Sequence, residues 1–177
     1  GLGGQIRFSG GIKAGWDPSV QADLEGALDL TRFRGPGIAI KSIKGPIHGK
    51  VRGDSVEGSG SVTLEGIDAS GTLIDVMRLD FSGGQSAEGA VDAEAELGIG
   101  LIAMPDGQFD MEGLSGHLVA SIPADGALDA EAKLNVQTFR FGDEGYEVDG
   151  GPVVFSAKGD AVAADIDLRR EDAPFLV

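Results

Sequence analysis

The stretch "VQADLEGALDL", residues 20–30, shows the pattern that decides the fold. Apolar or small residues occupy every second position, namely Val20, Ala22, Leu24, Gly26, Leu28 and Leu30. Asp23, Glu25 and Asp29 lie between them. A period of two is typical of a β-strand with one apolar face and one polar face, because successive side chains point to opposite sides. The spacing of three and four residues that marks an amphipathic helix is missing.

The same alternation recurs along the chain, in "SVEGSGSVTLEG" (55–66), "AVDAEAELGIGL" (90–101), "ALDAEAKLNV" (127–136) and "AVAADIDLRR" (161–170). Ala, Glu and Leu favour helix, so 90–97 and 127–134 keep a helical alternative. Gly-rich pairs and triplets separate the alternating segments and suit tight turns between antiparallel strands. We therefore expect roughly ten strands, several of which reach about 33 Å at ~3.3 Å per residue.

These features predict an all-β fold: a long antiparallel meander curled into a groove, taco-like or solenoid-like, with one apolar and one polar face. We expect residues 1–177 to form one domain, a segment excised from a longer repetitive β protein. Residues 38–51 and 109–122 share an apolar skeleton that indicates a repeat. The expected apolar face is rich in Ala, Gly and Val. It is either packed against a second layer or left open for a long apolar ligand, and periodicity alone leaves both open.

The composition restricts the function classes. A net charge of −15 argues against a nucleic-acid partner, because phosphate binding needs a basic surface. The chain has no cysteine, which excludes disulfides and thiolate metal sites. We expect no metal, no cofactor and no catalytic residues.

The two histidines, His48 and His117, are too few for a zinc site. We expect them to point outward, on opposite faces of equivalent strands. "GDSV" at 53–56 shares letters with a hydrolase nucleophile motif, but the partner Asp and His near the C-terminus are missing, so Gly53 and Asp54 are expected in a hairpin turn.

Three further groups have a simple structural interpretation. Asp106, Asp110 and Glu112 are carboxylates beside a turn, and Met111 stands where a calcium loop needs glycine. The run "GIGL" at 98–101 lacks the following helix that a phosphate-binding loop requires. The basic residues of one segment are Lys41, Lys44, Lys50 and Arg52. They are expected to balance neighbouring carboxylates on a polar strand face, with lipid headgroups or a protein partner as the alternative.

Two longer stretches carry a resemblance to a known family. They are "GALDLTRFRGPGIAIKSIKGPIHG" (26–49) and "VEGSGSVTLEGIDASGTLIDVMRLDFS" (56–82). The shared features are a strand that ends in aromatic-x-Gly, a strand of the form apolar-x-apolar-x-x-apolar-x-Gly-x-Ile, and a Gly-Ile hairpin. Residues 24–168 resemble the AsmA-like superfamily, and within it the YdbH-type intermembrane phospholipid-transport proteins of Gram-negative bacteria.

The resemblance implies a lipid-binding groove segment of a periplasm-spanning protein that moves phospholipid between the inner and outer membranes, in outer-membrane biogenesis. Phospholipid acyl chains, the rest of a full-length chain at both ends, and envelope proteins are the implied partners, and an inner-membrane anchor is implied for the full-length protein. The alternative is a structural or adhesive β-solenoid or sandwich segment of a secreted or cell-surface protein. The residues expected to line the groove are Leu24, Leu28, Gly58, Gly60, Val62, Leu64, Val91, Ala93, Ala95, Leu97, Leu134 and Ile166.

Overall fold

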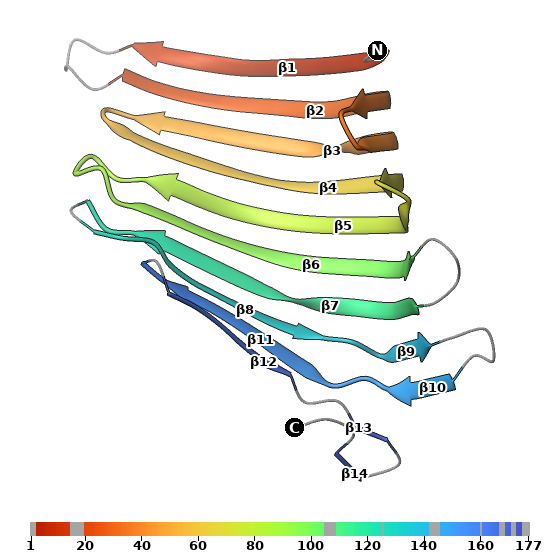
Figure 1. The fold of residues 1–177 in the computed structure, drawn as a ribbon. Coiled ribbons are helices and arrows are strands. Elements are labelled where there is room, and N and C mark those ends of the chain that lie inside the picture. Colours follow the sequence, from red (N-terminus) through yellow and green to blue (C-terminus); the bar gives the residue numbers. More distant parts are fainter. Residues whose placement is uncertain are drawn as a thin grey trace.

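The alternating segments form one large antiparallel sheet in the computed structural model (Figure 1). The strands are β1 (Gly3–Ala14), β2 (Val20–Gly35), β3 (Ile38–Arg52), β4 (Ser55–Ala69), β5 (Thr72–Gln85), β6 (Val91–Ala103), β7 (Phe109–Ile122), β8 (Asp129–Asn135), β9 (Thr138–Phe141), β10 (Tyr146–Asp149), β11 (Pro152–Lys158), β12 (Ala161–Ile166), β13 (Arg169–Arg170) and β14 (Ala173–Pro174). The helical alternatives at 90–97 and 127–134 were wrong, because these residues lie largely in β6 and β8.

The structure describes the backbone of residues 3–14, 20–104, 109–124, 126–141, 146–159, 161–166, 169–170 and 173–174. It describes side chains for 21–104, 109–124, 126–141, 149–159 and 161–165. No described segment forms a helix of the length and apolarity that a membrane span requires.

The strands follow one another as a meander. Their order across the sheet is β1-β2-β3-β4-β5-β6-β7-β8-β11-β12, and β9 continues beyond β8 to pair with β7 and β10. The sheet is not closed, because β1 and β12 lie at its opposite edges (Figure 1). This architecture confirms the expected all-β meander with one apolar and one polar face, and the sheet is curled.

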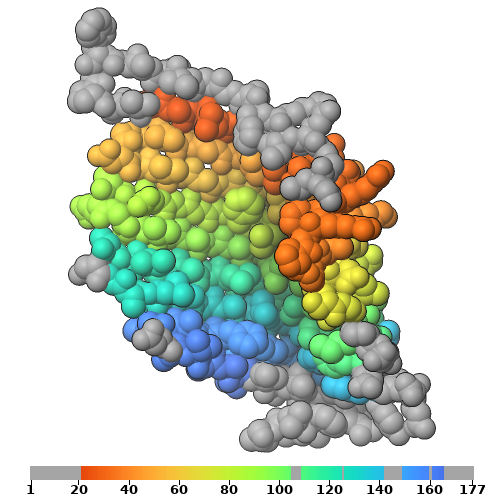
Figure 2. Space-filling view, turned by 45° about the horizontal axis from the view of Figure 1, so that its top comes forward, coloured from red at the N-terminus to blue at the C-terminus, as the bar shows by residue number. Residues whose placement is uncertain are grey.

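A line of bends crosses the sheet near one end of its strands. In Figure 1 the right-hand ends of β2 and β3, and of β4 and β5, turn away from the run of the sheet, and in Figure 2 their orange and yellow atoms stand forward of its broad surface. At this line the apolar alternation changes phase in six strands. The apolar pairs that flank it are three residues apart: Leu30 and Phe33, Ile43 and Ile40, Leu64 and Ile67, Met77 and Ile74, Ile99 and Ile102, Leu114 and Met111.

In three of the six strands, β2, β4 and β7, the backbone geometry accounts for the change of phase. Three residues at this line have positive φ angles: Arg32 in β2 (56°), Gly66 in β4 (58°) and Gly113 in β7 (67°). The backbone pairing is also interrupted there, since Thr31 pairs with Ser42 and Phe33 with Ile40, but the residues between them do not pair. A left-handed residue inside a strand reverses its pleat, so two apolar residues with an odd spacing can face the same side.

The best-buried residues lie on both sides of this bend. Val62 and Ile99 before it are 8% and 7% exposed, and Ile40 and Ile67 beyond it are 7% and 5% exposed. The apolar face therefore lies on the inside of the bend, where the two parts of each strand cover one another. Strict period two predicted one uniform apolar face along each strand, and the bend divides that face in two.

A small core fills the corner at the C-terminal side of the sheet. Val136, Phe139 and Val153 are buried together, and the residues packed against them are Phe109, Met111, Leu114, Leu134 and Phe141. The rings of Phe109, Phe139 and Phe141 have centroids 5.3–6.1 Å apart, a usual aromatic packing distance. Leu114 and Met111 both pack on this core although they are three residues apart, which confirms the reversed pleat in β7.

Candidate functional site: an apolar trough across the strands

A row of very small residues crosses the apolar face at right angles to the strands. Backbone pairing places the following residues opposite one another from β3 to β11: Gly49, Gly58, Gly83, Ala93, Ala120, Ala130 and Ala157. We call this the floor row. It crosses seven strands, so its length is about 29 Å at an interstrand spacing of about 4.8 Å. No member of the row has a side chain larger than a methyl group.

Two rows that include larger residues flank the floor row. The outer row consists of Ala22, Val51, Val56, Gln85, Val91 and Ile122. The ridge row, toward the bend, consists of Gly26, Ile47, Gly60, Phe81, Ala95, Leu118, Ala132, Phe155 and Ala164. The floor row therefore runs along the bottom of a trough whose walls are apolar except at Gln85.

The ridge row alternates small and large residues from strand to strand. Ile47, Phe81, Leu118 and Phe155 are separated by Gly or Ala, so neighbouring large residues are about 9.6 Å apart, two interstrand steps. Gly60 shows why a small residue is needed between them. A Cβ atom at Gly60 would lie 2.7 Å from the Phe81 ring. The ring can therefore keep its position only if residue 60 is glycine.

At the trough the apolar face has a depression, and large apolar side chains around it are exposed to solvent. A depression of about 530 Å³ extends from Gly58 in β4 to Val162 in β12, with Phe81, Leu118 and Phe155 among its lining residues. Large apolar side chains around it are exposed to an unusual degree: Leu24 43%, Val56 47%, Ile122 42%, Phe155 40% and Val162 78%. A single sheet has no second layer to cover such a face, so these side chains need a ligand or a partner for burial.

The twelve residues expected to line the groove share this face in the backbone pairing. Gly58 and Ala93 belong to the floor row, Gly60 and Ala95 to the ridge row, and Val91 to the outer row. Another row, toward the bend, contains Leu28, Val62, Leu97, Leu134 and Ile166, the last with only its backbone described. Leu24 pairs with Gly49 at the edge of the floor row, and Leu64 lies next to the bend.

Two of these positions differ in character from an open groove lining. Val62 is buried, and Leu64 pairs with Ile43 beside the bend, so both lie on the inside of the bend instead of in the exposed trough. Phe81, Leu118 and Phe155 were not among the residues expected to line the groove. Each shows the correct period within its own strand, but only the register between strands places them in one row with small residues between them.

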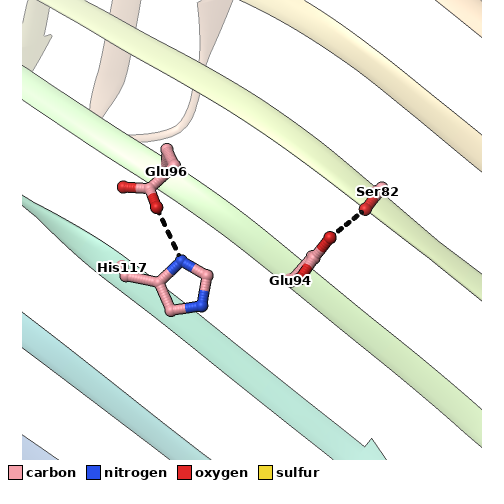
Figure 3. A network of polar contacts seen from close by, with 4 residues as sticks. All are labelled: Ser82, Glu94, Glu96 and His117. Atoms are coloured by element: carbon pink, nitrogen blue, oxygen red, sulfur yellow. Dashed lines mark hydrogen bonds and ion pairs between the residues drawn. The ribbon is translucent and has the colours of Figure 1, made fainter.

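The polar face carries hydrogen bonds and ion pairs between neighbouring strands. Ser82 donates to a carboxylate oxygen of Glu94 at 2.8 Å, and Nδ1 of His117 lies 2.8 Å from Glu96 Oε1 (Figure 3). Ser42 likewise donates to Glu65 at 2.9 Å. The partners of each pair are directly opposite each other in the sheet. The Ser82–Glu94 and His117–Glu96 pairs are exposed, and exposed pairs contribute little stability each, whereas Ser42 is buried.

Two further hollows lie over this polar face, and the larger of them exceeds the depression at the trough in volume. One of about 720 Å³ has His48, Lys50, Glu57, Asp92 and Glu131 among its lining, and one of about 480 Å³ reaches His117. Among the side chains that the structure describes, no group of three or more His, Asp and Glu residues has the arrangement of a metal site.

Both histidines lie on the polar face, so the prediction that they occupy opposite faces was wrong. His48 pairs with Ser59 and with Glu25, whereas His117 pairs with Glu96 and Lys133. In the aligned repeats His117 corresponds to Pro46, which is two residues from His48, and an even spacing keeps one face. Their outward orientation is as expected.

The other short motifs have structural roles. Gly53 and Asp54 form the turn between β3 and β4, and Gly98 and Gly100 lie within β6. Asp106 lies outside the described residues, whereas Glu112 forms an ion pair with Arg140 at 3.2 Å.

Of the four basic residues in segment 41–52, two lie opposite carboxylate residues of neighbouring strands. Lys44 is opposite Asp29, and Lys50 stands between Asp23 and Glu57. This placement fits the expected charge balance on a polar strand face.

Comparisons with known proteins give no relative. No family model matches the chain, and neither a curated protein nor a solved structure is similar to it.

Proposed function

We propose that this protein binds the acyl chains of phospholipids along the trough, as a groove segment that carries lipid without catalysis. The observation that supports this proposal is the open apolar face: a floor row of Gly and Ala between two apolar walls, with large side chains beside it left exposed. A hydrocarbon chain laid over the floor row would cover these side chains and needs no polar contact of its own.

The dimensions of the trough suit such a ligand. The floor row measures about 29 Å, close to the ~30 Å hydrocarbon thickness that two opposed acyl chains make in a bilayer. Each methylene removed from water contributes about 0.8 kcal/mol, so about ten methylenes contribute about 8 kcal/mol. That amount is comparable with the cost of about 4–15 kcal/mol for immobilising a ligand. Affinity would then come from chain length, with little dependence on the headgroup.

The cellular role in this proposal comes from the resemblance noted above. It assigns the chain to the periplasm, to a longer protein anchored in the inner membrane, and to phospholipid movement between the two membranes. A structural or adhesive segment is the competing function, in which another layer of protein covers the trough permanently.

A binding experiment with variants of the trough tests the proposal. Ala93→Trp narrows the floor, and Ala95→Asp places a carboxylate between the large residues of the ridge row. Ala93 is exposed, so tryptophan there should change the free energy of unfolding by no more than about 0.5 kcal/mol. Leu73→Trp is the matched control, because Leu73 is 54% exposed in β5 and lines none of the hollows described above.

We expect delipidated parent protein to bind a fluorescent long-chain phospholipid and to release it to unlabelled phospholipid. Both trough variants should bind at least about tenfold more weakly, a loss of about 1.4 kcal/mol, whereas Leu73→Trp should bind like the parent. Native mass spectrometry of the purified parent should also show retained phospholipid. If the parent retains none and binds no probe, the lipid proposal is wrong and the structural role is left.

A further inference from the structure

At β2 the trough has a reversed profile. On β3 the floor residue is a glycine that stands between two larger wall residues, Val51 and Ile47. On β2 the residue that continues the floor row is Leu24, whereas the residues that continue the two walls are Ala22 and Gly26. A large side chain therefore stands in the floor at the strand where both walls consist of small residues.

The side chain of Leu24 lies at the end of the floor row. Leu24 pairs with Gly49 on β3 and with Gly10 on β1, so the row returns to glycine on the other side of it. A Cβ atom at Gly49 would lie 3.7 Å from the Cβ atom and 3.9 Å from the Cδ1 atom of Leu24, so the leucine stands directly beside the floor of β3. Leu24 is 43% exposed and is therefore open to contact with a ligand on the floor row.

We propose that Leu24 is the stop of the trough, the residue that the end of a bound acyl chain meets and does not pass. The inference rests on the proposed function and adds the residue that limits where the chain can lie. From Gly10 to Ala157, the paired residues of this row are all glycine or alanine except Leu24. Leu24 was expected to line the groove, and its position gives it a more specific role. The chain can move along the row on the β3 side of Leu24, and it cannot move on to β1.

The walls of β3 close the way around the stop. Leu24 lies diagonally opposite Val51 in the outer row and Ile47 in the ridge row. Residues in this diagonal relation have Cα atoms about 7–8 Å apart, and long side chains bridge that distance. A chain that stays on the floor row would overlap the leucine side chain, and one that rises over it loses its dispersion contacts with the floor. Three apolar side chains therefore close the lane between β3 and β2.

Photo-crosslinking shows how far along the row a chain reaches. The probe is a phosphatidylcholine with a diazirine at the end of one acyl chain, bound to delipidated protein, and mass spectrometry identifies the labelled residues after digestion. In the parent we expect label on β3 to β8 but none on residues 3–14 of β1. Leu24→Ala should be labelled on residues 3–14 as well, because the row then contains only glycine and alanine as far as β1.

Two further variants separate a stop from a general loosening of β2. Leu30→Ala makes the same chemical change in the same strand, beside the bend and outside the floor row, and should leave residues 3–14 unlabelled. Gly49→Leu, added to Leu24→Ala, puts a leucine back into the row one strand away and should exclude the label from residues 3–14 again. Gly49 can accept a side chain, because the atoms nearest to its Cβ position are 3.7 Å away. Circular dichroism and melting temperatures check that all variants are folded.

The position of the label decides the outcome. A parent labelled on residues 3–14 as strongly as Leu24→Ala overturns the proposal that Leu24 is a stop. The same holds if Leu30→Ala is labelled there like Leu24→Ala, or if the double variant keeps the label on residues 3–14. A parent that takes up label on no strand at all overturns the proposed function, and the stop with it.

Discussion

The bend across the sheet makes a sharp prediction about two glycines. Gly66 has a φ of 58° and lies at the bend in β4, and a Cβ atom there would lie 3.1 Å from the Cβ of Lys41. Gly66→Ala should therefore destabilise the protein by about 1–2 kcal/mol, the cost of a left-handed conformation for an L-residue. Gly98 in β6 has open space within 4 Å and no left-handed φ. Gly98→Ala should stabilise the protein by about 0.5–1 kcal/mol, because alanine loses less backbone entropy on folding.

The two variants make the same chemical change, so their difference isolates the backbone conformation. Urea unfolding, followed by circular dichroism, should separate them by about 1.5–3 kcal/mol, with melting temperatures that move in opposite directions by about 2–4 °C per kcal/mol. Arg32, with a φ of 56° in β2, supplies the reverse experiment. Arg32→Gly should leave stability unchanged or raise it by up to about 1 kcal/mol, since relief of strain exceeds or balances the added entropy of the unfolded chain. If Gly66→Ala is as stable as Gly98→Ala, the bend does not depend on the left-handed residue.

Three further predictions address the inside of the bend, the strand spacing and the polar face. Ile67→Ala should cost about 2–5 kcal/mol because Ile67 is 5% exposed, whereas Val162→Ala at 78% exposure should stay within about 0.5 kcal/mol, and equal urea midpoints would contradict the burial pattern. Gly116→Ala should cost about 1–3 kcal/mol in the same assay, because its Cβ would overlap the backbone of β8, and an unchanged midpoint would mean that β7 and β8 are not so closely apposed. Glu96→Gln, which removes the charge beside His117, should change the free energy of unfolding by less than about 1 kcal/mol, and a larger loss that persists in high salt would show that this exposed pair has a structural role.

The sequence by itself determined the strands and, over most of each strand, the face of each residue. Glu25, Asp29, Glu65 and Glu96 are exposed on the polar side as the alternation predicts, and Asp167 lies outside the described residues. This success has a local cause. Successive side chains of a strand point to opposite sides whatever the rest of the chain does, so the period of the pattern contains the information.

The bend and the trough were decided by the tertiary structure. The spacing of three residues between Ile40 and Ile43 is visible in the sequence, but it is equally compatible with a strand end, a bulge or a reversed pleat. Only the pairing with neighbouring strands shows that six strands change phase along one line. In the same way, Gly83 and Ala120 are ordinary small residues in their own strands, and they become the floor of a trough only because the register places them in one row. Register depends on contacts between residues far apart in the chain, and the period within one strand does not contain it.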